Sequence, residues 1–328
     1  MPANSSFDDI VTTTLRNRSG KLADNATRTT ALLDRLRRRG KVRPAAGGRT
    51  IVQELEVGLN DQGGWFAGYD TLNTVPYEPF TAAEYDWKQA YVPVVWSGLE
   101  KLKNMGEHEV IDLVAGRIKN GEKALYDLVA QAAYSAGTSY GGKQMHGLGL
   151  MVTASANQSV GGISQSTYSF WANQAKTVDF DAATNIATTN PSPVLSKINE
   201  LAIACTRGSD RPDLRIGDAT GYRAYLEALQ PIQRITSEEM AGAGFTALKY
   251  YGVGSAADFV LDNGYCPSKT IYALNTNFLY LRPHPDRNFM PFGGDRIPVN
   301  QDATVRFLGF AGNMTASNLA RQGILSDA

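Results

Sequence analysis

Residues 50–59 alternate apolar and polar side chains, which is the pattern of a half-buried β-strand. Residues 85–96 also read as a strand, but apolar side chains occupy both of its faces. One face carries Tyr85, Trp87, Tyr91 and Val95, and the other carries Ala90, Val92, Val94 and Trp96. A lone hairpin cannot bury both faces, and a two-stranded ribbon is marginal in water by itself. The pattern therefore predicts a β-ribbon over residues 50–96 that needs cover from outside the hairpin.

The middle of this ribbon carries Trp65, Phe66 and Tyr69 among glycines, where a solvated loop is normally polar. Aromatic residues at strand spacing more often serve packing than ligand binding, and interface cores are enriched in Trp and Tyr. We therefore expect other copies of the chain to cover the ribbon, which favours an assembly protein.

Residues 98–136 have apolar positions spaced mostly by three or four, which is typical of a helix. A single helix of this span would be roughly 55–60 Å long. Gly106, Gly116 and Gly121 each weaken such a helix by about 1 kcal/mol relative to alanine. The pattern predicts either one long helix held by packing, which we favour, or a break at Asn120–Gly121.

The rest of the chain is predicted to form a mixed α+β lobe preceded by an arm. Residues 1–20 are predicted to be a flexible arm, residues 25–39 a short helix, and residues 137–192 mostly surface loop. An amphipathic helix is predicted over 193–206, with Pro193 in its first turn and Gly208 after its end. Further predictions are a helix near 222–229 and strands near 245–251, 270–274, 278–281 and 304–310, the last of which can return to the long helix.

The charge of the chain is unevenly distributed. The 328 residues are 43% hydrophobic, enough for a substantial core in two lobes, and the formal net charge is zero. Residues 1–49 hold eleven Lys and Arg against four Asp and Glu, a balance of +7, which leaves −7 for the remainder. The basic run over residues 35–43 could bind a polyanion such as packaged nucleic acid, bind the acidic body of a neighbouring subunit, or be solvated.

The sequence offers no recognisable catalytic or metal-binding motif. Cys205 and Cys266 do not have the spacing of a metal site. The three histidines, His108, His146 and His284, are not gathered at short spacing. No nucleophile elbow, phosphate-binding loop or H-E-x-x-H motif occurs. Because catalytic groups converge in space rather than in sequence, these observations favour a structural role without excluding an enzyme.

The N-terminus lacks the apolar core of a signal peptide, and no apolar run reaches the roughly 18 residues of a membrane-spanning helix. We therefore expect a cytoplasmic protein, or a particle assembled in a cytoplasm, without a membrane partner.

Several segments resemble a known family. They are residues 161–174 (GGISQSTYSFWANQ), 272–289 (YALNTNFLYLRPHPDRNF), 293–296 (GGDR), 300–303 (NQDA) and 308–315 (LGFAGNMT). Together they resemble the tailed-bacteriophage major capsid proteins with the Hong Kong 97-type fold. The resemblance covers most of the chain after residue 50 and is weak over the first 49 residues.

This resemblance implies an α+β capsid fold and a division of the chain into five segments. They are an N-terminal arm (1–48), an extended β-hairpin loop (49–97), a peripheral domain with a spine helix (98–190), an axial domain (191–303), and a return strand to the peripheral domain with a C-terminal tail (304–328). It also implies hexamers and pentamers that tile an icosahedral head around double-stranded DNA, without catalysis or cofactors. The short arm favours a separate scaffolding protein, and portal and decoration proteins are further expected partners. The place of action would be the virion, assembled in the cytoplasm of a bacterial host.

The candidate inter-subunit contacts are aromatic residues of the ribbon and arginines of the arm. They are Trp65, Phe66, Tyr69, Tyr85 and Trp87, together with Arg35, Arg37, Arg38 and Arg39. Lys88 lies in the loop, but no position is indicated for a partner in a cross-link, so none is predicted. The alternatives are an encapsulin-like nanocompartment, a soluble hydrolase with an unrecognised site, and a nucleic-acid-binding module.

Overall fold

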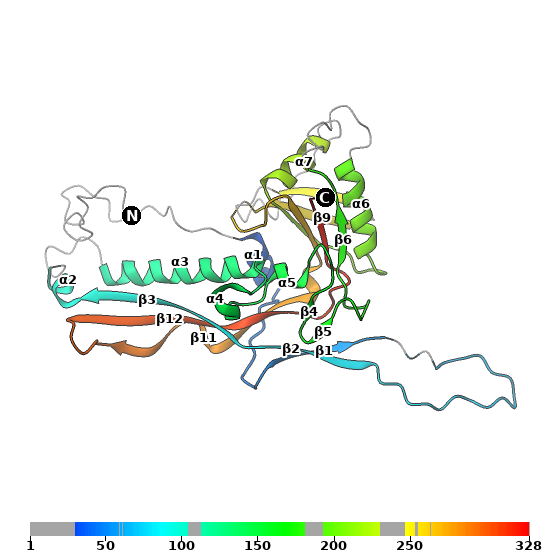
Figure 1. The fold of residues 1–328 in the computed structure, drawn as a ribbon, viewed down its shortest axis with the longest axis horizontal. Coiled ribbons are helices and arrows are strands. Elements are labelled where there is room, and N and C mark those ends of the chain that lie inside the picture. Colours follow the sequence, from blue (N-terminus) through cyan, green and yellow to red (C-terminus); the bar gives the residue numbers. More distant parts are fainter. Residues whose placement is uncertain are drawn as a thin grey trace.

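A computed structural model describes residues 30–58, 60, 62–103, 113–180, 193–229, 247–252, 255–262 and 264–327. The chain forms two lobes and a projecting ribbon (Figure 1). In the long lobe, helix α3 lies along a three-stranded sheet. In the wedge lobe, helices α6 and α7 pack on a six-stranded sheet. This confirms a mixed helix and sheet architecture with several separate sheets.

The long lobe is built around strand β12 (Ala303–Ala316). β12 pairs antiparallel with β11 (Leu279–Arg296) on one side and with β3 (Lys88–Ser97) on the other. Side chains alternate along β3, so that Val94 and Trp96 are buried while Tyr91 and Val95 are exposed. β3 is an edge strand, which explains how it accommodates Pro93, a residue that cannot donate to a ladder.

Helix α3 (Leu113–Tyr134) packs against the buried face of this sheet. It passes through Asn120–Gly121 without interruption, so the alternative of a break at that point is wrong. A Cβ atom added at Gly121 would lie 2.7 Å from Val94 Cγ2 and 3.0 Å from Leu308 Cδ1. Gly121 weakens the isolated helix, but because it has no Cβ it allows the helix to lie close to the sheet.

The predicted single helix over 98–136 can be followed only in part. The short helix α2 (Gly98–Lys103) follows β3 directly, and its Glu100 forms an ion pair with Arg117 of α3 at 2.8 Å. Residues 104–112, which include Gly106 and His108, lie outside the described residues.

The wedge lobe has the strand order β6-β13-β10-β7-β9-β8. These strands are β6 (Gln174–Thr177), β13 (Gly323–Ser326), β10 (Thr270–Leu274), β7 (Leu214–Gly217), β9 (Ser255–Leu261) and β8 (Ala247–Gly252). Helix α6 (Pro193–Cys205) buries Val194, Ile198, Leu201 and Cys205, the stripe that the sequence predicts. Helix α7 (Ala219–Leu229) packs Tyr222 and Tyr225 on Phe259.

The C-terminal segment divides between the two lobes. β12 returns to the long lobe as predicted, but β13 pairs with β6 and β10 of the wedge lobe. The tail expected after the return strand therefore contains a strand, residues 323–326, that belongs to the wedge-lobe sheet. The pairing explains the burial of Ile324 and Leu325, which a solvated tail would expose.

The expectation that residues 137–192 are mostly surface loop agrees with the secondary structure of residues 137–180, most of which lie outside helices and strands, but it misses their buried side chains. This segment forms α4 (Ser139–Gly142), α5 (Leu148–Met151), β4 (Ser159–Val160), β5 (Ile163–Ser164) and β6. Leu148, Met151 and Trp171 are buried, and the Trp171 indole N–H donates to the Val160 carbonyl at 3.0 Å. The glycines and amides make tight turns around these apolar residues, so a loop-like composition conceals part of the core. Residues 181–192 lie outside the described residues.

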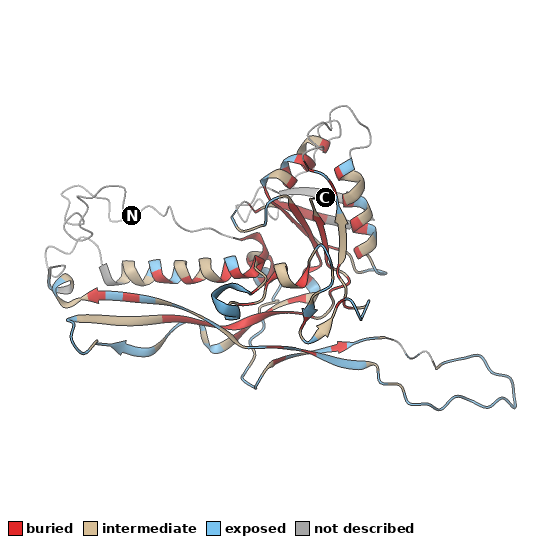
Figure 2. Ribbon diagram, in the orientation of Figure 1, coloured by how far each residue is buried: buried red, intermediate tan, exposed pale blue. Residues whose placement is uncertain are grey.

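Buried residues concentrate where the two lobes meet, and the ribbon is largely exposed (Figure 2). Two short elements complete the junction: helix α1 (Ala31–Arg38) and the 3-10 helix η3 (Thr276–Phe278). Within the described part of the chain, none of the helices is both long enough and apolar enough to cross a membrane.

Two glycines of α3 allow a matched test of its packing. Gly121→Ala should lower the free energy of unfolding by about 1–3 kcal/mol, because the buried, β-branched Val94 cannot give way easily. Gly116→Ala meets nothing within 4 Å, so it should raise the free energy by up to about 1 kcal/mol through helix propensity. Urea unfolding curves of both variants measure the difference, and equal effects would contradict the close-approach role of Gly121.

Candidate functional site

The ribbon is anchored at its root in its own chain. Strands β1 (Ile51–Glu56) and β2 (Phe80–Tyr85) pair antiparallel, with Ile51 opposite Tyr85 and Glu56 opposite Phe80. The inner face of the pair buries Ile51, Leu55, Ala83 and Tyr85. At Gly161, an added Cβ would lie 2.7 Å from Ala83 Cβ, so the β4–β5 turn closes tightly over this face. The direction in which the ribbon leaves the body is therefore set by packing within one subunit.

Tyr85 was expected at an inter-subunit contact, and the structure corrects this. Its side chain is only 1% exposed, and its hydroxyl accepts a hydrogen bond from the Ala316 backbone N–H at 3.3 Å. Burial raises the pKa of the phenol well above its ordinary value, with a smaller opposing effect of the Ala316 backbone. Tyr85 is a core residue of its own subunit.

The returning limb of the ribbon is divided into two strands. β2 ends at Tyr85, and β3 begins at Lys88 and leaves the ribbon to pair with β12. Val94 and Trp96 are consequently covered within the same chain, not by a second copy. Trp87, between the strands, is half-buried, donates to the Gly48 carbonyl at 3.0 Å and lies edge-on to His284. The expectation that other copies cover the limb over 85–96 is wrong for this inner face.

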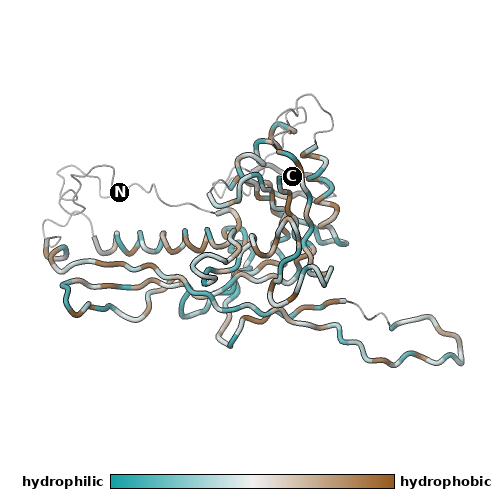
Figure 3. Tube along the Cα trace, in the orientation of Figure 1, coloured by the Kyte–Doolittle hydropathy of each residue, from teal (hydrophilic) through white to brown (hydrophobic). Residues whose placement is uncertain are grey.

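The outer part of the ribbon is different, because its aromatic side chains face solvent. Trp65 and Tyr69 are fully exposed, and Phe66 is 66% exposed. Five further apolar residues of the ribbon are also exposed and were not among the predicted contacts: Val52, Val57, Leu72, Val75 and Phe80. Figure 3 shows hydrophobic positions at intervals along the projecting ribbon. Trp65, Phe66 and Tyr69 lie within five residues of one another on this projecting segment, and aromatic side chains are enriched at protein interfaces, which favours an interaction site here.

The arginines of α1 have different environments. Arg35 is buried between two carboxylates, with Nε 3.4 Å from Asp213 Oδ2 and Nη2 3.2 Å from Asp258 Oδ2. The expectation that Arg35 contacts a neighbour is therefore wrong, because its charge is neutralised inside its own wedge lobe. Arg38 pairs with Asp34 at 2.8 Å and Arg39 with Asp213 at 3.4 Å, yet both remain solvent-accessible, as does Arg37.

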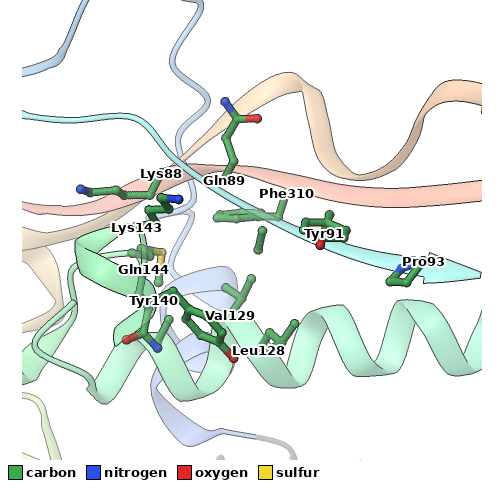
Figure 4. A pocket seen from close by; sticks show the side chains of 13 residues that line it. Lys88, Gln89, Tyr91, Pro93, Leu128, Val129, Tyr140, Lys143, Gln144 and Phe310 are labelled. Atoms are coloured by element: carbon green, nitrogen blue, oxygen red, sulfur yellow. The ribbon is translucent and has the colours of Figure 1, made fainter. Parts of the chain in front are cut away.

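A groove of about 570 Å³ opens between the edge of β3, helix α3 and the α4 turn (Figure 4). Its floor is apolar and includes Leu128, Val129 and Phe310. Lys88 and Lys143 stand on its rim, and the Lys88 ammonium donates to the Gly142 carbonyl at 2.8 Å. The groove therefore offers a non-polar surface beside β3, the edge strand of the three-stranded sheet.

The titratable groups of the described chain are dispersed. No three or more His, Cys, Asp or Glu residues gather there in a way that could hold a metal ion. Burial lowers the pKa of His146, whose ring lies 3.4 Å from the Asn313 side-chain nitrogen. Burial raises the pKa of the Cys205 thiol to about 12, and Cys266 is shifted in the same direction. The surfaces of the ribbon and of α1 are therefore the candidate functional site.

The sequence matches no family model and no curated protein. Its structure, however, is similar to solved structures over nearly its whole length. The cyanophage A-1(L) capsid asymmetric unit matches with a TM-score of 0.67 and 15% identity, covering 95% of this chain and 97% of that one. A structure from Mycobacterium phage Bobi matches with a TM-score of 0.58 and 12% identity, covering 99% of both chains. The SrpI encapsulin from Synechococcus elongatus matches with a TM-score of 0.50 and 9% identity, covering 93% of this chain and 92% of that one. The chain therefore has a phage capsid fold.

Two arginines of α1 allow a matched test of the junction. Arg35→Ala should lower the free energy of unfolding by about 3–5 kcal/mol, because two carboxylates would stay buried without their cation. Arg38→Ala removes a solvent-accessible pair on the same helix and should cost at most about 1 kcal/mol. Chemical denaturation of both variants measures the difference. A small effect at Arg35 would argue against its role in fastening α1 to the wedge lobe.

Proposed function

We propose that this chain is the major capsid protein of a tailed bacteriophage, with a Hong Kong 97-type fold. Copies of it would form the hexamers and pentamers of an icosahedral head around double-stranded DNA. The observation that carries the proposal is the ribbon, which is rigidly rooted in its own subunit but presents Trp65, Phe66 and Tyr69 to solvent. The phage capsid fold of the whole chain supports it. In this role the protein is a structural component and not an enzyme.

The proposed division of the chain follows from this assignment. Residues 1–48 would be the arm, the ribbon the extended loop, α3 the spine helix of a peripheral domain, and the wedge lobe the axial domain. The pairing of β3 and β13 shifts two of the proposed domain boundaries. β3 belongs by its pairing to the peripheral sheet, and β13 belongs to the axial sheet.

Assembly would rest on many modest contacts that closed symmetry combines. Heterologous contacts between identical subunits build closed rings when the rotation between neighbours closes. The ribbon aromatics would provide the anchors, since buried Trp and Tyr side chains dominate the energetics of many interfaces. Trp87 would contribute through its exposed part. Arg37, Arg38 and Arg39 would contact a neighbouring subunit or packaged DNA without sequence specificity.

The proposed place of action is the virion, after assembly in the bacterial cytoplasm. A separate scaffolding protein, a portal protein and a decoration protein would be the other partners.

An encapsulin-like compartment is the second candidate, supported by the likeness to the SrpI encapsulin. The two candidates share a shell and differ in its contents. Electron microscopy of purified particles, followed by nuclease and mass-spectrometric analysis, separates them. Double-stranded DNA inside closed shells supports the capsid, whereas an enclosed protein cargo without DNA supports the compartment.

The double variant Trp65→Ser/Phe66→Ser tests the role of the ribbon. Its subunit should fold normally, because neither side chain is buried in the chain. Its yield of closed shells should fall about tenfold or more, since truncation of aromatic anchors typically costs 2 kcal/mol or more per hot spot. Negative-stain microscopy and sedimentation of particles measure the yield.

Ile203→Ser is a matched control, because this exposed apolar residue lies on α6, outside the ribbon. It should assemble at a yield close to that of the unmodified chain. Normal shells from the Trp65→Ser/Phe66→Ser variant would refute the docking role of the ribbon tip.

A further inference from the structure

Three cationic side chains surround one tyrosine beside the root of the ribbon. Lys41 Nζ, Arg43 Cζ and Arg282 Cζ lie 5.4, 5.1 and 5.5 Å from the centre of the Tyr280 ring. The backbone brings them together, because Val42 bridges to Leu281 and the Arg43 N–H donates to the Leu281 carbonyl at 2.9 Å. Residues 41–45 thereby run alongside β11. We refer to Lys41, Arg43 and Arg282 as the basic cluster.

Among the described residues of its own subunit, the basic cluster lacks a counter-charge. Across the described residues, no carboxylate forms an ion pair with any of its three members. Arg282 donates to the neutral Gln53 Oε1 at 2.8 Å, and its buried Nε has no hydrogen-bond partner among the residues that the structure describes. Burial and the nearby Arg43 both lower the pKa of Arg282. Like charges held this close to one another favour an external anion.

The outer face of the ribbon has the opposite property. In the β1–β2 register, Glu84 lies opposite Val52 and Glu56 opposite Phe80, so Glu54, Glu56 and Glu84 share one face with these two apolar residues. All three glutamates are exposed, and none forms an ion pair within the described part of the chain. Glu54 and Glu56 are spaced by about 7 Å along β1, two residues at the rise of a strand. We refer to this surface as the acidic face.

The basic cluster and the acidic face cannot meet within one subunit. Arg282 reaches the ribbon from its inner side, at Gln53. Gln53 alternates along β1 with Val52 and Glu54, whose side chains point to the outer face. Because no cation among the described residues pairs with these outward glutamates, a second copy of the chain is the favoured source of their counter-charge.

We propose that the acidic face of one subunit's ribbon binds the basic cluster of a neighbouring subunit. This proposal rests on the proposed shell function, and it identifies the charged residues of one subunit interface. In a head-to-tail ring, each copy offers its ribbon to one neighbour and its basic cluster to the other. Val52 and Phe80, exposed beside the glutamates, contribute apolar area to the same contact. Complementary charges would also fix the register of the ribbon and reject wrong docking.

Packaged DNA is the competing occupant of the basic cluster. The acidic face favours the sister subunit, because a DNA-binding cluster would leave its three glutamates without an ion-pair partner among the described residues. The two occupants respond differently to charge reversal at the ribbon, which affects only the subunit contact.

A charge-swap experiment tests the proposal with the full-length chain. Lys41→Glu/Arg43→Glu and, separately, Glu54→Lys/Glu56→Lys should each lower the yield of closed shells about tenfold or more, because like charges would face each other across the contact. The variant that combines all four substitutions should restore the yield to within about threefold of the unmodified chain, since opposite charges meet again. Sedimentation and electron microscopy measure the yield, and circular dichroism of the subunits confirms folding.

Arg223→Glu is the matched control, because Arg223 is exposed on α7 and its one ion pair within the described residues is with Glu227 of the same helix. It should leave the shell yield unchanged. Failure of the fourfold variant to recover, or normal yields from both double variants, would overturn the proposal. Normal shells with reduced DNA content from Lys41→Glu/Arg43→Glu would also overturn it and assign the cluster to DNA. If the unmodified chain forms no shells under any condition, the proposed function itself fails, and this contact fails with it.

Discussion

Strand β12 holds together the part of the molecule on which the ribbon depends. It pairs with β11 along one edge and with β3 along the other, and its Leu308 lies against α3. The same strand reaches the root of the ribbon, where Ala316 is hydrogen-bonded to Tyr85. One continuous strand therefore connects the far end of the long lobe to the point where the ribbon leaves the body. A ribbon fixed in this way points in a defined direction before any partner arrives.

The two lobes are joined by buried polar contacts as well as by apolar packing. Arg35 links α1 to Asp213 and Asp258 of the wedge lobe. At the end of α3, the Tyr134 hydroxyl donates to Asp262 Oδ2 at 2.6 Å. Buried polar groups are costly unless they are paired in good geometry. Such contacts therefore tolerate few relative orientations of the two lobes, which suits the proposed role as a repeated subunit of a shell.

The solvent-exposed surfaces of the subunit have distinct chemical characters. The ribbon exposes aromatic side chains at its tip and glutamates at its root, while the basic cluster lies beside Tyr280. Each of these features is unfavourable or unsatisfied in an isolated subunit. The long lobe adds an unpaired edge at β3 with an apolar groove beside it. A folded subunit that exposes several such surfaces is suited to self-association.

The sequence by itself determined the local elements whose periodicity is strong. The stripe of α6, the strand β10 and the tail strand β12 follow from patterns of neighbouring residues, and the bare aromatic tip follows from its unusual composition. Only the tertiary structure decided which partners these elements take. Tyr85 and Arg35 read as surface residues because their covering groups, Ala316 and the carboxylates of Asp213 and Asp258, lie more than 170 residues away. Leu148, Met151 and Trp171, in the loop-like segment before β6, are buried for the same reason. The local sequence pattern determines the secondary structure that a segment prefers. Burial depends on residues that are distant in the sequence, so a short stretch of sequence does not reveal it.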